Sequence, residues 1–421
     1  MTTLLTNIAA LVNVREENRL LRGKELAKLP CIKDAYLIIE DDEIAAYGCM
    51  KDLLLKAADF QFHFNLSGRY VLPSWCDSHT HLVFAGSRET EFIDKLKGAS
   101  YAEIAARGGG ILNSAKKIKE ISEDELFVQS CKRLQEIKCL GTGAVEIKSG
   151  YGLSVEGELK MLRVIKKLKE KSKVLIRSSF LGAHTFPHEY KNDHQGYIDL
   201  IINQILPVIA AEKLADYIDV FCEQGFFSPE ETETISRAGM SYGLKTKIHA
   251  NQLSASGAVQ IGVKLNALSV DHLEVMNDDD IKALANSNTI GTLLPTAAFF
   301  LRSPYQPARK LIDANCAIAL ASDFNPGSSP SGNMNFVVAL SCIQLGMLPE
   351  EAINAATLNG ASAMEVQDKA GSISKGKKAN LIVTKPIPSV YYLPYSFGSN
   401  NIERVMLCGE WLQSSASEFK S

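Results

Sequence analysis

Two histidines separated by one residue, His79 and His81, follow a short apolar run in the sequence CDSHTHLVFAG (residues 76–86). Side chains of an extended strand alternate between its two faces, so both imidazoles point to the same face and can share one ligand. The pair alone is a weak indication of a metal, because a histidine on an apolar face is more often a core residue. Metal binding therefore depends on further donors at the same place.

Such donors occur where other predicted strands end. Eight short apolar runs alternate with segments of helical periodicity, and each run ends in polar residues. The ends lie near residues 79–81, 147–152, 181–184, 222–225, 248–252, 270–274, 293–296 and 321–327. This alternation predicts an α/β fold, a (β/α)₈ (TIM) barrel over residues 69–365. A doubly wound sheet fits less well, because no GxGxxG motif follows an early strand.

Five of the eight histidines and one aspartate lie at these strand ends: His79, His81, His184, His249, His272 and Asp323. The carboxyl ends of barrel strands converge on one mouth, so these side chains should meet there. Imidazole nitrogens with a carboxylate oxygen suit Zn²⁺, and the same donors accept iron. We predict that a metal ion, zinc or iron, is bound by His79, His81, His249 and Asp323.

The end of the fourth strand predicts the number of ions. Binuclear hydrolases of this architecture commonly place a carboxylated lysine or a glutamate there, which bridges two ions. This strand ends in Glu223 and Gln224, and Glu223 fits better as a buried polar partner for a neighbouring strand. Lys148 and Lys247 lie on the second and fifth strands, where neither is placed to bridge. We therefore expect one metal ion per chain.

Both ends of the chain predict β structure. Residues 36–48 read as a strand, an acidic turn and a strand (YLIIEDDEIAAYG), and the C-terminal sequences KKANLIV and IERVMLCGEWL are again short strands around turn residues. We predict that residues 1–68 and 366–421 together form a small β-sandwich domain beside the barrel.

Composition excludes several kinds of partner. The 421 residues have a net charge of −3 without a basic stripe, so neither nucleic acid nor a membrane is expected as a partner. Nine cysteines without a CxxC motif lie mostly in apolar runs, which is typical of a reducing compartment. The N-terminus lacks a basic region before its apolar stretch, and no apolar run is long enough to span a membrane. We expect a cytoplasmic protein.

The motifs resemble a known group of hydrolases. HTH on the first strand, His on the fifth and sixth, Asp on the eighth and the following GSISKGKKANLIV (371–383) are similar to the amidohydrolase superfamily. Six segments resemble the imidazolonepropionase family within it: DSHTHLVFAGSRETEF (77–92), SYAEIAARGGGI (100–111), AVEIKSGYGL (144–153), FLGAHTFP (180–187), HANQLSASGA (249–258) and SDFNPGSSP (322–330). The resemblance covers essentially the whole chain. It implies hydrolysis of the cyclic amide of 4-imidazolone-5-propanoate to N-formimino-L-glutamate in histidine degradation, and a homodimer.

The resemblance also implies roles for single residues. Asp323 would accept the proton of the attacking water and pass it to the departing ring nitrogen, while His272, unless it is a core histidine, would orient the attack or stabilise the oxyanion. Arg88 would hold the substrate's propionate carboxylate, unless it forms a surface salt bridge with Glu89 or Glu91. The further substrate-binding positions are Tyr101, Tyr151, His184, Asn325, Gly327 and Ser328. Glycines 108–110 fit either a mobile lid or a tight turn.

Position 252 separates this function from its main alternative. Many members of the superfamily carry glutamate in an HxxE pattern on strand five, whereas this chain has Gln252. Glutamine can hydrogen-bond the ring amide but cannot exchange a proton, so we predict a substrate-binding role. A nucleobase deaminase of the cytosine or guanine type would use the same histidines and aspartate but requires that glutamate. A catalytically inactive metal-binding barrel is a third possibility, and the candidate substrate groups argue against it.

Overall fold

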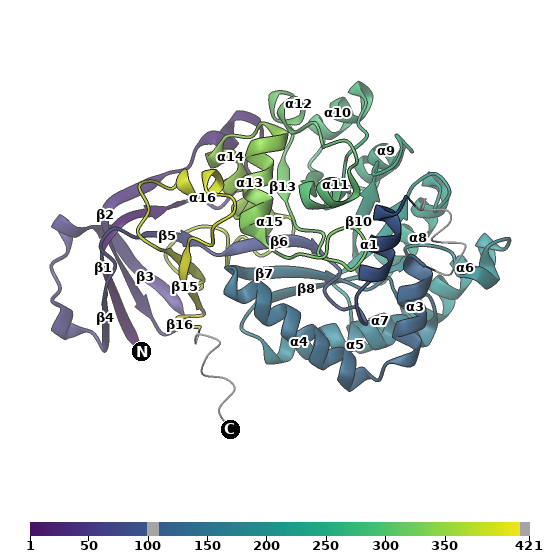
Figure 1. Cartoon of the computed structure of the whole chain (residues 1–421), viewed down its shortest axis with the longest axis horizontal. Coiled ribbons are helices and arrows are strands. Elements are labelled where there is room, and N and C mark those ends of the chain that lie inside the picture. The colour runs from purple at the N-terminus through teal and green to yellow at the C-terminus, as the bar shows by residue number, and fades with distance from the viewer. Residues whose placement is uncertain (99–108, 413–421) are drawn as a thin grey trace.

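The computed structural model describes residues 1–98 and 109–412 (Figure 1). Eight parallel strands, hydrogen-bonded in chain order, form a barrel: β6 (Trp75–Thr80), β7 (Thr142–Lys148), β8 (Leu175–Ala183), β9 (Tyr217–Cys222), β10 (Lys245–Ala250), β11 (Ser269–His272), β12 (Ile290–Leu293) and β13 (Ile318–Leu320). The predicted barrel is confirmed, and its strands end where the sequence places polar residues.

The barrel closes between its first and last strands. Thr80 of β6 forms a parallel bridge with Phe324, just beyond β13. The N–H of Asp323 donates to the carbonyl of His79 at 3.0 Å, and the N–H of His81 donates to the carbonyl of Phe324 at 2.9 Å. Closure therefore brings the HTH motif and Asp323, which are distant in the sequence, to adjacent positions.

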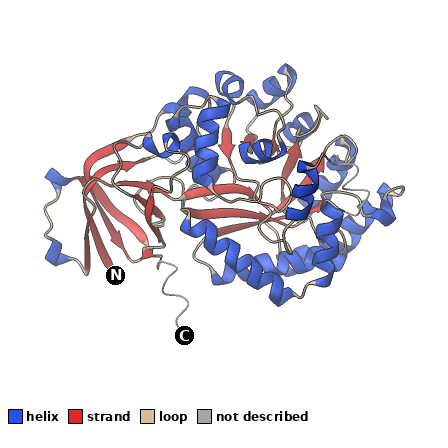
Figure 2. Cartoon of the chain, viewed as in Figure 1, coloured by secondary structure: helices blue, strands red, loops and turns tan. Residues whose placement is uncertain are grey.

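Helices surround the barrel strands (Figure 2). They are α1 (Glu89–Leu96), α3 (Ile111–Glu120), α4 (Glu123–Cys139), α5 (Val155–Lys171), α6 (His194–Leu200), α7 (Leu206–Glu212), α8 (Pro229–Ser241), α9 (Ala258–Lys264), α10 (Asp278–Ala285), α11 (Pro295–Leu301), α12 (Ala308–Asp313), α13 (Met334–Leu345), α14 (Pro349–Ala356) and α15 (Leu358–Ser362). The short α16 (Tyr392–Tyr395) packs against α13.

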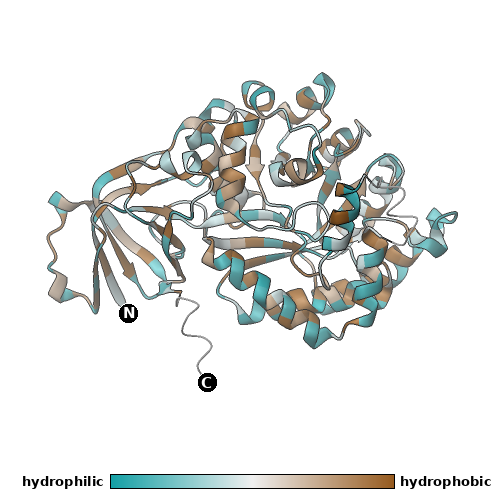
Figure 3. Cartoon of the chain, viewed as in Figure 1, coloured by the Kyte–Doolittle hydropathy of each residue, from teal (hydrophilic) through white to brown (hydrophobic). Residues whose placement is uncertain are grey.

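The sequence explains where the longer helices begin and which face they bury. The hydroxyl of Ser122 accepts the N–H of Glu125 at 3.2 Å, which satisfies a donor at the start of α4. Ser154 caps α5 in the same way, at 3.1 Å from the N–H of Gly157. Figure 3 shows hydrophilic and hydrophobic residues alternating along both helices. The apolar residues of α5 lie in the main core against the barrel.

The two chain ends form a second sheet beside the barrel, drawn in purple and yellow in Figure 1. Its strands are β1 (Thr2–Val12), β2 (Cys31–Glu40), β3 (Glu43–Cys49), β4 (Phe62–Asn65), β5 (Tyr70–Pro73), β14 (Leu381–Thr384), β15 (Ile402–Leu407) and β16 (Glu410–Trp411). All belong to one hydrogen-bonded sheet, because the long β1 pairs with β2 on one edge and with β4 and β5 on the other. We predicted a small β-sandwich domain from both chain ends; β structure from both ends is confirmed, and its strands form one separate sheet.

The apolar run around the first barrel strand divides between the two sheets. We predicted that the first part of the small domain ends at residue 68, but β5, at residues 70–73, pairs with β1 and β14 of the end-derived sheet. The barrel strand begins only at Trp75, after Pro73 and Ser74. A single apolar run thus supplies one strand to each sheet, which the sequence pattern alone does not separate.

Over residues 1–98 and 109–412, every helix is too short or too polar to cross a bilayer.

Candidate metal centre and substrate pocket

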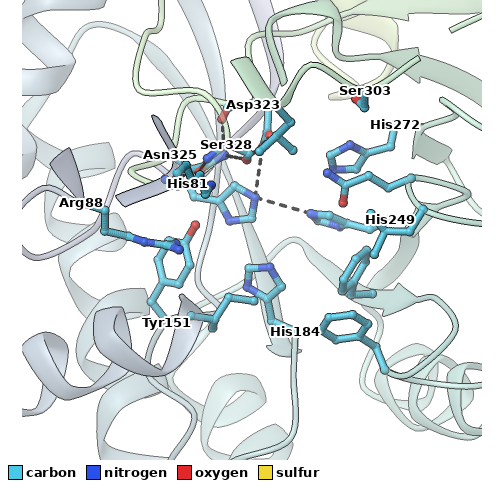
Figure 4. A pocket seen from close by; sticks show the side chains of 18 residues that line it. His81, Arg88, Tyr151, His184, His249, His272, Ser303, Asp323, Asn325 and Ser328 are labelled. Carbon is cyan, nitrogen blue, oxygen red and sulfur yellow. Dashed lines mark hydrogen bonds and ion pairs between the residues drawn. The ribbon is translucent and has the colours of Figure 1, made fainter. Parts of the chain in front are cut away.

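The side chains predicted as metal ligands meet at the mouth of the barrel, where dashed lines in Figure 4 join His81 to Asp323 and to His249. The Nε2 atoms of His81 and His249 are 3.5 Å apart. Asp323 Oδ1 lies 3.5 Å from His81 Nε2 and 3.6 Å from His79 Nε2. All four side chains are buried, and their donor atoms gather at this one place.

Unpaired atoms indicate that this cluster fits a cation. His79 Nε2 and Asp323 Oδ1 are buried and have no hydrogen-bond partner among the residues that the structure describes. Leaving such groups unpaired is costly, whereas coordination to a metal would satisfy both. Within the described ranges, two donor groups have atoms within 4.8 Å of one another: His79, His81 and His249, and His79, His272 and Asp323. His272, which we predicted only as a catalytic residue, therefore also lies within reach of a metal.

Carboxylates orient two of the histidines. His79 Nδ1 lies 2.7 Å from Asp271 Oδ2, and His249 Nδ1 lies 3.1 Å from Asp219 Oδ1. Each contact leaves Nε2 directed toward the cluster, the arrangement usual for histidine ligands of metals. Neither aspartate was among the predicted site residues. A signal was present, because each is a charged residue inside an otherwise apolar strand (YIDVFC and SVDH).

The protonation states favour metal binding. Burial, together with nearby Lys148 and the other histidines, lowers the pKa of His79 well below its ordinary value. Burial also lowers the pKa of His249, despite the opposing effect of Asp219. Burial alone would raise the pKa of Asp323, but the neighbouring histidines outweigh it and lower that pKa. Neutral imidazoles and an ionised carboxylate are the forms that bind metals.

Glu223 serves a neighbouring loop. Its carboxylate accepts the N–H of Gln224 at 3.0 Å and of Leu253 at 2.9 Å, and it also accepts the hydroxyl of Ser254. Glu223 is absent from the donor clusters found among residues 1–98 and 109–412. Glu223 is buried, as predicted, but its hydrogen-bond partners lie in its own turn and in the loop after β10 and not on a neighbouring strand. The prediction of a single ion stays a prediction.

The metal cluster opens into a cavity of about 340 Å³. Every predicted substrate-binding residue lines it except Tyr101, which lies outside the described residues, as does Gly108. In Figure 4, Arg88 and Tyr151 lie on one side of this pocket and His249 and His272 on the other, with His81 between them. The prediction missed part of the lining: Lys95, Ile111, Phe221, Phe226, Leu253, Leu301 and Ser303. The ion and the substrate groups thus face one space.

A buried glutamate holds the loop that carries Tyr151. The carboxylate of Glu158, on α5, accepts the N–H groups of Gly150, Gly152 and Leu153 at 2.7 to 3.0 Å. The carbonyl of Gly150 in turn lies 3.0 Å from Nδ1 of His184, so the other ring nitrogen of His184 is available to the pocket. Glu158 is fully buried, so its three hydrogen bonds to this loop are shielded from water.

Arg88 forms the salt bridge with Glu91 that was its predicted alternative, but the pair is buried and does not lie at the surface. Its Nε and Nη2 lie 2.8 and 2.7 Å from Glu91 Oε2, and both side chains are less than one-tenth exposed. Glu91 also accepts the N–H of Gly110 at 3.2 Å and Nδ2 of Asn113 at 2.8 Å. Nη1 of Arg88 points instead toward Gly327, where an added Cβ would lie 2.3 Å from it. Glycine at 327 therefore makes room for the guanidinium.

Comparisons with known proteins identify the group to which this site belongs. The model of the amidohydrolase family matches residues 221–412. An imidazolonepropionase from Flavobacterium johnsoniae is 60% identical over 411 residues, which are 97% of this chain and 100% of the relative. One from Clostridium tetani is 42% identical over 388 residues, 92% of each chain. The chain belongs to the imidazolonepropionase family. It is a hydrolase, and its donor set together with the family indicates a divalent metal ion.

Solved structures support the fold alone, because their sequences are distant from this imidazolonepropionase-family chain. Atrazine chlorohydrolase from Arthrobacter aurescens, complexed with zinc, is 14% identical with a TM-score of 0.71, over 97% of this chain and 95% of its own. Guanine deaminase from E. coli is also 14% identical with a TM-score of 0.71, over 98% and 99% of the two chains. The barrel and the end-derived sheet are thus shared by enzymes with different reactions.

Proposed function

We propose that this protein hydrolyses 4-imidazolone-5-propanoate to N-formimino-L-glutamate, a step of histidine degradation. The observation that carries the proposal is that Arg88 and the metal cluster face the same cavity. The cluster suits hydrolysis of the ring amide, and a guanidinium at the other side suits the carboxylate of the propionate side chain. Membership of the imidazolonepropionase family supports the same reaction.

We propose one zinc or iron ion, bound by His79, His81, His249 and Asp323. When bound, such an ion lowers the pKa of water to about 7 and so supplies hydroxide at neutral pH. Three imidazoles and one carboxylate suit zinc, and the same nitrogen and oxygen donors suit iron.

We infer that Asp323 moves the proton of the attacking water. The hydroxyl of Ser328 donates to Asp323 Oδ2 at 3.0 Å, which leaves Oδ1 toward the histidines. In this proposal Asp323 takes a proton from the water as it adds to the ring carbonyl, and returns it to the ring nitrogen as the C–N bond breaks. His272 stabilises the oxyanion, and its Nδ1 lies 3.4 Å from Glu274 Oε1. Burial alone would lower the pKa of His272, but Glu274 outweighs it and raises that pKa.

The remaining pocket residues orient the ring and its side chain. Asn325 Oδ1 accepts the N–H groups of Gly327 and Ser328, both at 2.8 Å, and these hydrogen bonds hold the loop after β13. Tyr151, His184 and Gln252 lie around the cavity and offer polar groups to the ring amide. Fixed polar groups of this kind favour reaction by holding the scissile bond at the metal.

Incubating the purified protein with imidazolone propionate tests the proposed function. We expect consumption of the imidazolone and stoichiometric formation of formiminoglutamate, followed by the ultraviolet absorption of the ring and by product analysis. Guanine and cytosine, assayed under the same conditions, should release no ammonia above background. Deamination at a rate comparable to ring opening would refute this function and support the deaminase alternative, and absence of every reaction would support an inactive metal-binding barrel.

Replacing Gln252 with glutamate tests its assignment to binding. Gln252→Glu preserves the shape of the side chain, so the fold and the bound metal should be retained. Because the amide only hydrogen-bonds the ring in this proposal, we expect KM for imidazolone propionate to change more than kcat. Steady-state kinetics with metal analysis of the same sample measure both. If turnover instead fell by about 100-fold or more while KM stayed unchanged, the loss would match the contribution of an acid–base group and contradict the binding role.

Gly327→Ala should reduce turnover by displacing Arg88. An added Cβ would lie 2.3 Å from Nη1 and 2.8 Å from Cζ of Arg88, so the guanidinium must move away. A misplacement of about 1 Å can reduce the rate by roughly 100-fold, and we expect kcat/KM to fall by about 10- to 100-fold. Gly398→Ala is the matched control, because an added Cβ there meets nothing within 4 Å. Equal kinetics of the two variants would show that Arg88 need not occupy its observed position.

A further inference from the structure

A cluster of buried charges lies inside the barrel, beneath the metal site. Its members are Glu146 and Lys148 of β7, Asp219 of β9, Lys247 of β10 and Asp271 of β11, and each side chain is 0% exposed. Barrel interiors are usually filled by branched apolar side chains. Buried charges destabilise a protein unless they are well paired. Because two lysines and three carboxylates lie at this place, we infer that they serve a role beyond stability.

Lys148 joins the carboxylates that orient the metal ligands. Its Nζ donates to Asp219 Oδ2 at 2.7 Å, lies 3.6 Å from Asp271 Oδ2, and also donates to Glu146. Asp219 contacts His249 through Oδ1 and Lys148 through Oδ2, so neither oxygen can turn away without losing a partner. Asp271 Oδ2 lies near both His79 and Lys148. One ammonium group is thus connected to two predicted ligands.

We propose that Lys148 is a positioning residue of the metal centre, which holds Asp219 and Asp271 in the orientation that directs Nε2 of His249 and His79 toward the ion. This inference rests on the proposed metal-dependent function, but it concerns metal binding and not the substrate.

The charges explain why a lysine is needed. Without Lys148, Asp219 and Asp271 would be buried carboxylates that keep only their imidazole partners. A buried carboxylate that loses a partner is costly and turns toward other donors. If it turns, it no longer holds the imidazole Nδ1 in place, which would loosen the ring and the direction of its Nε2. Burial alone would lower the pKa of Lys148, but the three carboxylates outweigh it and raise that pKa, so the ammonium stays charged.

Lys247 provides a matched control in the same cluster. It is equally buried, and its Nζ donates to Glu146 and to the carbonyl of Ser78, the latter at 3.2 Å. In the described part of the chain it forms no hydrogen bond or ion pair with Asp219 or Asp271. Removing either lysine therefore deletes one buried positive charge next to Glu146, but only Lys148 touches the histidine-orienting carboxylates.

The test compares zinc affinity of Lys148→Met and Lys247→Met. Metal-free protein is titrated with Zn²⁺ in competition with a chromophoric chelator, and circular dichroism checks that each variant is folded. Loss of an outer partner of a metal ligand typically weakens binding by about 10- to 100-fold, which we expect for Lys148→Met. For Lys247→Met we expect a change well below that range, because in the described residues Lys247 makes no hydrogen bond or ion pair with Asp219 or Asp271.

The sign of the effect makes this test decisive. Coulomb repulsion alone predicts that removing a positive charge strengthens binding of a cation, so weaker binding reports the loss of orientation. Unchanged or tighter binding by Lys148→Met, or an equal loss in both variants, would overturn the proposal. Neither outcome would affect the assay with imidazolone propionate on the unaltered protein, which tests the proposed function separately.

A second comparison applies if Lys148→Met does not fold. Asp271→Asn is compared with the double variant Lys148→Met/Asp271→Asn, in which one charge of each sign has been removed. We expect the double variant to bind zinc at least about 10-fold more weakly than Asp271→Asn, because Asp219 and His249 still lose their lysine. Equal affinities would show that Lys148 contributes nothing through Asp219 and would overturn its role as a common anchor.

Discussion

His249→Ala should lose both the metal ion and the hydrolase activity. Its Nε2 lies 3.5 Å from His81 Nε2 within the donor cluster, so its removal deletes one of four proposed ligands. Without the ion, the pKa of the attacking water rises far above neutral, so hydroxide is no longer supplied, and kcat/KM should fall by at least about 1,000-fold. Elemental analysis should give close to one equivalent of metal per chain for the original protein and little for the variant.

The control for this variant is His194→Ala. His194 is 44% exposed and pairs with Glu231 at 2.9 Å, outside the metal cluster, so metal content and kinetics should be unchanged. Two equivalents of metal in the active original protein would contradict the single-ion proposal. Full activity after exhaustive chelation would contradict metal-dependent hydrolysis altogether.

The barrel was predictable because its strands are buried on both faces and end abruptly. Each run of apolar residues is bounded by a polar segment. Eight such runs that alternate with helices are typical of a closed barrel. The convergence of His79, His249 and Asp323 then follows from geometry, because the carboxyl ends of all eight strands meet at one mouth. The end-derived sheet was predictable from alternating strands at both termini, but the division of one apolar run between β5 and β6 was not.

The supporting contacts were not predictable because they depend on which face of each strand points inward. Asp219 and Asp271 are single charges inside apolar strands, and Lys148 was considered only as a bridging ligand. Their meeting inside the barrel depends on the relative register of β7, β9 and β11. Glu91, three residues after Arg88, suggested a surface pair. Its burial depends on Gly110 and Asn113 at the start of α3, a contact that a local pattern does not contain.

Arg88→Met should reduce hydrolysis because the guanidinium holds the propionate carboxylate. Arg88 is buried beside the pocket, and removing one partner of a desolvated charge pair typically costs about 2 to 5 kcal/mol. With about 1.4 kcal/mol for each tenfold change, kcat/KM for imidazolone propionate should fall by roughly 30-fold to several thousand-fold. The carboxylate is remote from the bond that breaks, so its binding orients the ring, and kcat should fall together with affinity.

Two comparisons separate substrate binding by Arg88 from a structural role. Arg88→Lys keeps the charge but not the planar fork, so it should restore only part of the lost activity. An imidazolone with an uncharged side chain should be a poor substrate of the original protein. Arg88→Met should hydrolyse it at nearly the same rate, since this substrate forms no charge pair with either protein. If Arg88→Met loses the same fraction of its activity on both substrates, Arg88 acts through its contact with Glu91 by holding α1 in place. The carboxylate of the substrate must then bind elsewhere at the mouth of the barrel.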